Sequence, residues 1–138
     1  MIPLAALVRA RGVADRVDFV GRIPEAELPA YCHACDAFCM PSVSRAEAFG
    51  FVQIEAMACG KPVVCCELNN GVTWVNRHEE TGLVVRPADV AALASALRRL
   101  QIDEVLRNRL GRQGRERALR EFSLEAMARG TLEVYREA

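Results

Sequence analysis

Two glutamates near the middle of the chain, Glu47 and Glu55, are the residues whose type and spacing best fit chemistry on a ligand. Seven residues separate them, and the pair Phe49–Gly50 lies between them. A carboxylate accepts hydrogen bonds and donates none, so it suits a ligand with vicinal hydroxyl groups, such as a ribose. Free backbone amides at a helix start favour a phosphate, and we expect them near Gly50–Val52. For the spacing alone, a solvated pair of surface glutamates is the more common arrangement.

The residues around the second glutamate predict a short helix followed by a buried strand. Phe51, Ile54 and Ala58 recur at helical spacing and mark one face of that helix. Gly60 suits the left-handed position just after a helix C-terminus. Residues 62–65 form an apolar run, as expected of a buried strand.

Glu55 is predicted to have apolar neighbours, because it shares a helical stripe with Val52 and Cys59. Burying a bare charge costs several kcal/mol, so a carboxylate in such a place needs a partner or a ligand. The two hydroxyl groups of a ribose would meet that need.

Residues 41–64, PSVSRAEAFGFVQIEAMACGKPVV, resemble the donor site of the GT-B glycosyltransferases, in particular the large retaining group called family 4. The positions in register are Pro41, Ser42, Glu47, Phe49, Gly50, Glu55, Ala56, Met57, Ala58, Gly60, Lys61, Pro62 and Val63. The resemblance implies that Glu55 holds the ribose and that Glu47, as the catalytic residue, meets the donor sugar. It implies that the sugar and the diphosphate meet the backbone of Phe49, Gly50, Phe51 and Val52.

The resemblance extends over nearly the whole chain. Residues 15–42 look like the family's strand, base-binding turn and helix, which implies that Arg22 and Ile23 flank the nucleobase, mostly through their backbone. A plain surface turn is the alternative for Arg22. Residues 122–135 resemble the last helix, which in the family crosses back toward the other domain.

Two departures from the family stand out. The family's Arg and Lys that grip the diphosphate would lie before Met1, and Arg45 is interpreted as a solvated loop residue instead. The loop at 67–75 carries most of the run NNGVTWVN, residues 69–76, where many relatives have a Gly-Gly pair followed by an acidic residue. Trp74 in this loop is predicted to pack on the core, with a place in the donor pocket as the alternative.

The rest of the chain alternates strands with helices. Strands are expected at 17–20, 37–40, 62–65 and 83–85. A helical turn is expected at 72–75, a short helix at 3–11, and further helices at 25–34, 90–100, 104–121 and 124–137. Asp89 and Ser123 are the expected helix caps. This alternation predicts an α/β fold with a Rossmann-like parallel sheet and helices on both faces, as in an N-terminally truncated GT-B C-terminal domain. Residues 1–138 would form one nucleotide-sugar-binding domain, with the loops after Val20, Met40 and Cys66 along one rim.

Composition excludes several functional classes. The 138 residues carry 18 basic and 18 acidic side chains, so nothing suggests nucleic-acid binding. The sequence has no run of eighteen apolar residues, so no membrane span is predicted. The six cysteines include a Cys32-x-x-Cys35 pair without a second pair to complete a zinc site, so small buried thiols in a reducing cytosol are the interpretation. The helical arginines Arg107, Arg109, Arg112 and Arg115 are expected on solvated faces.

The sequence thus predicts the donor-binding domain of a retaining glycosyltransferase that moves a sugar from a nucleotide diphosphate sugar to a glycan or lipid-linked acceptor. The resemblance implies that neither a metal nor a cofactor is needed. It also implies a role in bacterial surface-polysaccharide synthesis, in the cytoplasm and at the inner face of the membrane through a missing domain. This chain alone would be inactive, because the acceptor half is absent, and its truncated sheet would invite self-association. The alternatives are a GT-B nucleotide-sugar epimerase and a non-catalytic binding or interaction fragment.

Overall fold

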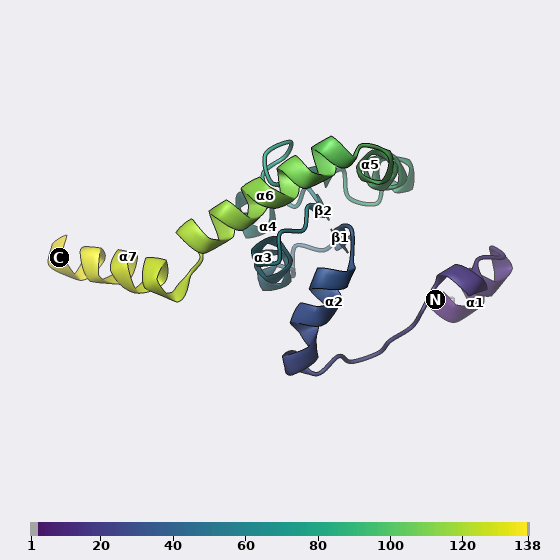
Figure 1. Cartoon of the computed structure of the whole chain (residues 1–138), viewed down its shortest axis with the longest axis horizontal. Helices are drawn as coiled ribbons and strands as arrows, with labels where there is room; N and C mark the ends of the chain where they lie inside the picture. Colours follow the sequence, from purple (N-terminus) through teal and green to yellow (C-terminus); the bar gives the residue numbers. More distant parts are fainter. Residues whose placement is uncertain (1–2, 138) are drawn as a thin grey trace.

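The computed structural model describes residues 3–137 and shows a three-stranded parallel sheet between two layers of helices (Figure 1). The strands, in the order β1-β2-β3, are β1 (Phe38–Met40), β2 (Val63–Cys66) and β3 (Gly82–Val85). Val64 in the central strand is in register with Cys39 of β1 and Leu83 of β3. The predicted α/β fold with a parallel sheet is therefore confirmed.

Seven helices accompany the strands within the described residues: α1 (Leu4–Ala10), α2 (Leu28–Ala34), α3 (Phe51–Ala58), α4 (Gly71–Val75), α5 (Val90–Ile102), α6 (Glu104–Glu121) and α7 (Leu124–Glu137). Both expected caps form. The Asp89 carboxylate accepts a hydrogen bond from the Ala92 amide at 2.8 Å, and the Ser123 hydroxyl accepts one from the Ala126 amide at 3.2 Å. The helix predicted at 25–34 is α2 preceded by a 3₁₀ turn at Glu25–Glu27, with a proline in its first turn.

Helices cover both faces of the sheet. Side chains alternate along β2, so Val63 and Cys65 join a core with α3, α4 and the second half of α6, whereas Val64 joins one with α5 and the first half of α6. The long α6 therefore contributes to both cores. Figure 1 shows α1 and α7 reaching away from this body at opposite ends, and neither helix has a buried residue.

The strand predicted at residues 17–20 is wrong. This segment is extended and exposed, in the arm that links α1 to α2, and it pairs with no strand within residues 3–137. Alternating apolar residues favour a strand only where a neighbour can accept and donate the backbone hydrogen bonds. The turn after Val20 was expected along the rim of the sheet, but no strand of residues 3–137 ends there to place it at that rim.

The helix around Glu55 forms as predicted, but the face of it that is buried was not predicted. Gly60 has φ +74°, and the amides of Gly60 and Lys61 bond back to the last turn of α3, as in a Schellman motif. The buried residues are Gln53, Ala56 and Met57, whereas Phe51 is 71% exposed. The apolar spacing of Phe51, Ile54 and Ala58 therefore marks a partly open surface, because α6 and the sheet together cover the adjacent face.

Gly111 lets α6 approach the turn after α3. A Cβ at Gly111 would lie 2.1 Å from the Gly60 carbonyl oxygen, and both groups belong to backbone that has little room to move. We expect Gly111→Ala to lower the free energy of unfolding by about 1–3 kcal/mol, as other overpacked sites do. Urea unfolding measures this loss.

Gly130→Ala in α7 is the matched control, because a Cβ there meets nothing within 4 Å. Alanine is about 1 kcal/mol better than glycine in a helix, so the control should be as stable as the wild type or more so. Equal unfolding midpoints for Gly111→Ala and the wild type would contradict the close approach.

Candidate functional site

The loops that follow β1 and β2 meet at the carboxyl edge of the sheet. The Asn70 side-chain amide donates a hydrogen bond to the Glu47 carbonyl oxygen at 2.7 Å. Pro41 and Cys66, one at the end of each strand, line a common hollow. In open α/β sheets, ligands bind beyond this edge. The structure thus places the Glu47 loop where a ligand is expected.

α3 begins directly after this loop. Gly50 precedes it with φ +77°, a left-handed conformation that a side chain rarely adopts, and no side chain caps the helix there. The amides of the first turn, at Phe51 and Val52, point out of a helix start and favour an anion. This geometry suits a phosphate, and the glycine lets the backbone approach it closely.

Glu55 lies one turn into α3, and its predicted burial is wrong. The residue is exposed, and no basic group within residues 3–137 pairs with it as an ion pair. Its apolar neighbours do not bury it. They line two separate hollows, one on either side of the helix, and Glu55 lines both of them. Its carboxylate is therefore available to a ligand without the cost of burial.

The first hollow beside Glu55 lies between α2 and α3 and is called the α2–α3 hollow. Its volume is about 350 Å³. Its lining residues are Glu25, Leu28, Pro29, Cys32, Glu55, Ala58 and Cys59. The volume falls at the lower end of the range of small-molecule sites. Arg22 is exposed and Ile23 half-buried just before this group, so the structure brings Glu25 and Leu28 beside Glu55, rather than Arg22 and Ile23 themselves.

The second, the aromatic hollow, measures about 380 Å³ and lies on the other side of Glu55. Its lining residues are Phe49, Phe51, Ile54, Glu55, Trp74, Glu121, Phe122 and Met127. The Phe49 ring centre lies 5.1 Å from that of Phe51 and 5.9 Å from that of Trp74. Trp74 is 53% exposed, so its predicted place in the core is wrong and it lines a hollow instead.

Arg117 packs under two rings of the aromatic hollow, and nothing in the sequence distinguishes it from the other charged residues of α6. Its side chain is 1% exposed and lies over the rings of Trp74 and Phe122, with its guanidinium carbon 5.6 and 5.2 Å from their centres. It donates to the carbonyl oxygens of Val75 at 3.2 Å and Trp74 at 2.8 Å, and it pairs with Glu121. Burial lowers the pKa of Arg117, while hydrogen bonding to Arg120, aided by the charge of Arg117, lowers the pKa of Glu121.

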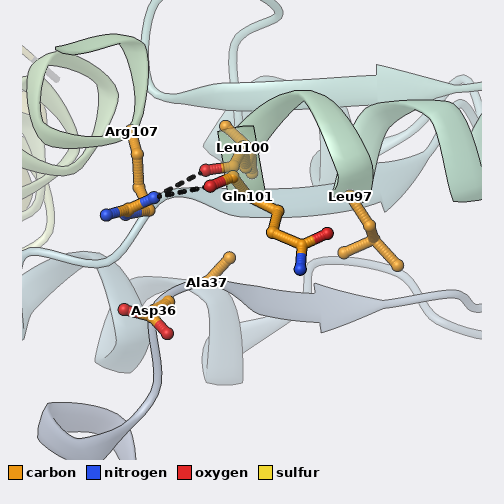
Figure 2. Close-up of a pocket in the computed structure, with 6 residues that line it drawn as sticks. All are labelled: Asp36, Ala37, Leu97, Leu100, Gln101 and Arg107. Atoms are coloured by element: carbon orange, nitrogen blue, oxygen red, sulfur yellow. Dashed lines mark hydrogen bonds between the residues drawn. The ribbon is translucent and has the colours of Figure 1, made fainter. Parts of the chain in front are cut away.

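Two of the arginines expected on solvated faces are instead half-buried. Arg109 donates to the Glu79 carbonyl oxygen at 3.0 Å. Arg107 donates to the carbonyl oxygens of Leu100 and Gln101 at the end of α5, as Figure 2 shows. The hollow drawn there, with Asp36 and Ala37 on its other wall, measures about 280 Å³ and lies at the amino end of β1. Ligands of open sheets bind at the opposite end, so this hollow is not the candidate site.

The interpretation of the cysteines as small buried thiols holds for Cys32, Cys65 and Cys66, whereas the other three are half-buried. All six are free thiols, and Cys35 donates to the Cys32 carbonyl oxygen at 3.3 Å. Burial raises the pKa of the Cys32 thiol, and it raises that of Cys65 to about 11. Both thiols therefore stay protonated at neutral pH.

Comparison with known proteins identifies the family. The family model described as "Glycosyl transferases group 1" matches residues 3–117. The chain belongs to this family. The D-inositol 3-phosphate glycosyltransferase of Salinispora tropica is 38% identical to this glycosyl transferase domain over 135 residues, which are 98% of the chain and 27% of the relative.

Solved structures show the same fold. Sucrose-phosphate synthase from Thermosynechococcus elongatus is 40% identical, with a TM-score of 0.87 over 97% of this chain and 33% of its own. The Anabaena protein HepE in complex with UDP is 26% identical, with a TM-score of 0.89 over 98% of this chain and 36% of its own. The group 1 domain thus has a GT-B glycosyltransferase fold and spans about a third of the length of these relatives. No helix within residues 3–137 is both long and apolar enough to cross a membrane.

Proposed function

We propose that this group 1 domain is the donor-binding, C-terminal domain of a retaining glycosyltransferase. The parent enzyme would transfer a sugar from a nucleotide diphosphate sugar to a glycan or lipid-linked acceptor. The observation that supports this most directly is the place of Glu55, a carboxylate with no ion-pair partner among residues 3–137, between two hollows and one helical turn from the uncapped start of α3. The relative HepE, whose structure contains UDP, supports the same class of ligand.

In this proposal the nucleoside occupies the α2–α3 hollow. Glu55 accepts hydrogen bonds from the ribose hydroxyls, and the turn with Arg22 and Ile23 borders the nucleobase. The diphosphate lies against the amides at the start of α3, where the positive end of the helix dipole and the free N–H groups stabilise it. The same amides stabilise the charge that grows on the diphosphate as it leaves, so neither a metal nor a cofactor is required of these residues.

Glu47 is the proposed catalytic residue, facing the donor sugar from the loop after β1. It is half-buried, and its carbonyl oxygen is held by Asn70, so its backbone has a defined place at the rim. The acceptor would reach the sugar from a part of the enzyme outside these residues. We therefore propose that this chain binds the donor but transfers nothing alone, and that the parent enzyme works in the cytoplasm in surface-polysaccharide or glycoconjugate synthesis.

A binding screen tests the proposal. UDP-glucose, GDP-mannose and ADP-glucose are titrated into the whole chain by isothermal calorimetry, together with the matching nucleoside monophosphates. We expect saturable binding of one nucleotide sugar, and weaker binding of its monophosphate, which lacks the β-phosphate and the sugar. If none of the three nucleotide sugars binds, the proposed function is wrong.

A further inference from the structure

The side chain of Asn70 joins the two rim loops, beside a longer contact in which the Arg45 guanidinium donates to the Asn69 carbonyl oxygen at 3.4 Å. The Asn70 Oδ1 accepts a hydrogen bond from the Val72 amide at 3.1 Å and so caps α4. Its Nδ2 donates to the Glu47 carbonyl oxygen at 2.7 Å. A single planar amide therefore links the start of α4 to the loop that carries Glu47.

Close packing reinforces this contact at the next residue. A Cβ at Gly71 would lie 2.7 Å from the Ala48 carbonyl oxygen and 2.7 Å from a ring carbon of Phe49. The backbone at Gly71 thus presses against the two residues that follow Glu47. Only a residue without a side chain permits this approach, so the loop cannot move toward α4.

Gln53 holds the same loop from the side of α3. Its side chain is fully buried, and its Nε2 donates to the Val72 carbonyl oxygen at 3.2 Å. A Cβ at Gly50 would meet this Nε2 at 2.6 Å, so the glutamine amide lies directly under the helix start. Its Oε1 has no hydrogen-bond partner within residues 3–137, and leaving a buried acceptor unpaired is costly. The Gln53 amide therefore joins the start of α3 to α4.

We propose that Asn70 is a positioning residue for the donor sugar, acting through the backbone of Glu47. This inference rests on the proposed function. Asn70 does not touch the donor. It sets where the Glu47 side chain and the first amides of α3 lie, and small displacements of such groups have large effects on binding and reaction. Glu55 lies a turn further along α3 and forms no hydrogen bond with Asn70. Binding of the nucleoside by Glu55 should therefore not depend on Asn70.

Asn70→Asp separates the two roles of this side chain. Aspartate caps a helix as well as asparagine does, so the bond from the Val72 amide remains. The donor to the Glu47 carbonyl oxygen is lost, and a negative oxygen faces it instead. We expect the affinity for the nucleotide sugar selected in the screen to fall about tenfold, and that for the nucleoside monophosphate to stay within about twofold. Asn70→Ser, which keeps the cap without the added charge but is too short to reach Glu47, should show the same split and replaces Asn70→Asp if that variant unfolds.

Asp103→Asn is the matched control, since it makes the reverse exchange at the cap of α6, where the Asp103 carboxylate accepts from the Leu106 amide at 2.8 Å. It should bind both ligands like the wild type. If the wild type and this control bind no nucleotide sugar, the proposed function fails. If they bind it and both Asn70 variants bind it equally well, or lose both ligands equally, the positioning role is wrong.

Discussion

Replacing Glu55 by alanine is expected to weaken binding of the nucleotide sugar by about 1–3 kcal/mol, or about 5- to 150-fold in Kd. The carboxylate is unpaired within the described residues and lines both hollows, so its loss removes charged hydrogen bonds to the ligand without breaking an ion pair of the fold. Because Glu55 is exposed, the unfolding free energy should change by no more than about 0.5 kcal/mol. Calorimetric titration and urea unfolding measure the two quantities.

The 2′-deoxy form of the same nucleotide sharpens this test. If Glu55 holds the ribose hydroxyls, the deoxy nucleotide should bind the wild type more weakly than the ribonucleotide, and Glu55→Ala should bind both alike. Glu133→Ala, at an exposed glutamate of α7 that lines neither hollow, controls for the general effect of removing one negative charge. The ribose role is wrong if Glu55→Ala keeps the wild-type preference for the ribonucleotide.

Features that depend on local chemistry could be predicted from the sequence. The start of α3 after a glycine, its end at Gly60, and the caps at Asp89 and Ser123 each rest on a residue that acts within its own turn. The parallel sheet followed from short apolar runs between helices. The loop with Glu47 also lies at the carboxyl edge of the sheet, as predicted, because strand ends and the loops after them are adjacent in sequence as well as in space.

Features that depend on distant partners could not be predicted. The segment at 17–20 has the alternation of a strand but no neighbouring strand among the described residues. The exposure of Glu55 and the burial of Gln53 follow from where α4 and α6 pack against α3, which the spacing within α3 does not encode. Asn70 stood in a loop that departs from the family's pattern, and its contact with Glu47 joins residues 23 positions apart.

Arg117 is the second residue whose replacement should have a large effect, in this case on stability. Arg117→Ala removes a buried cation that bonds two carbonyl oxygens at the end of α4 and pairs with Glu121. Those carbonyls would lose their partner, Glu121 would keep Arg120 alone, and the rings of Trp74 and Phe122 would lose the group they pack on. We expect the free energy of unfolding to fall by about 3–5 kcal/mol. Urea unfolding followed by the fluorescence of Trp74, the only tryptophan, reports this directly.

Arg115→Ala, two residues away on the exposed side of α6, should change the free energy of unfolding by no more than about 0.5 kcal/mol.

The pH dependence of stability gives a further check on the ion pair between Arg117 and Glu121. The pKa of Glu121 is held below its usual value by Arg120 and Arg117, so its stabilising effect is present above the unfolded pKa and is lost as the pH falls through the lowered one. The stability difference between the wild type and Arg117→Ala should therefore shrink in acid. A difference that stays constant down to the acid unfolding of the wild type would mean that Arg117 acts through the carbonyls and rings rather than through Glu121.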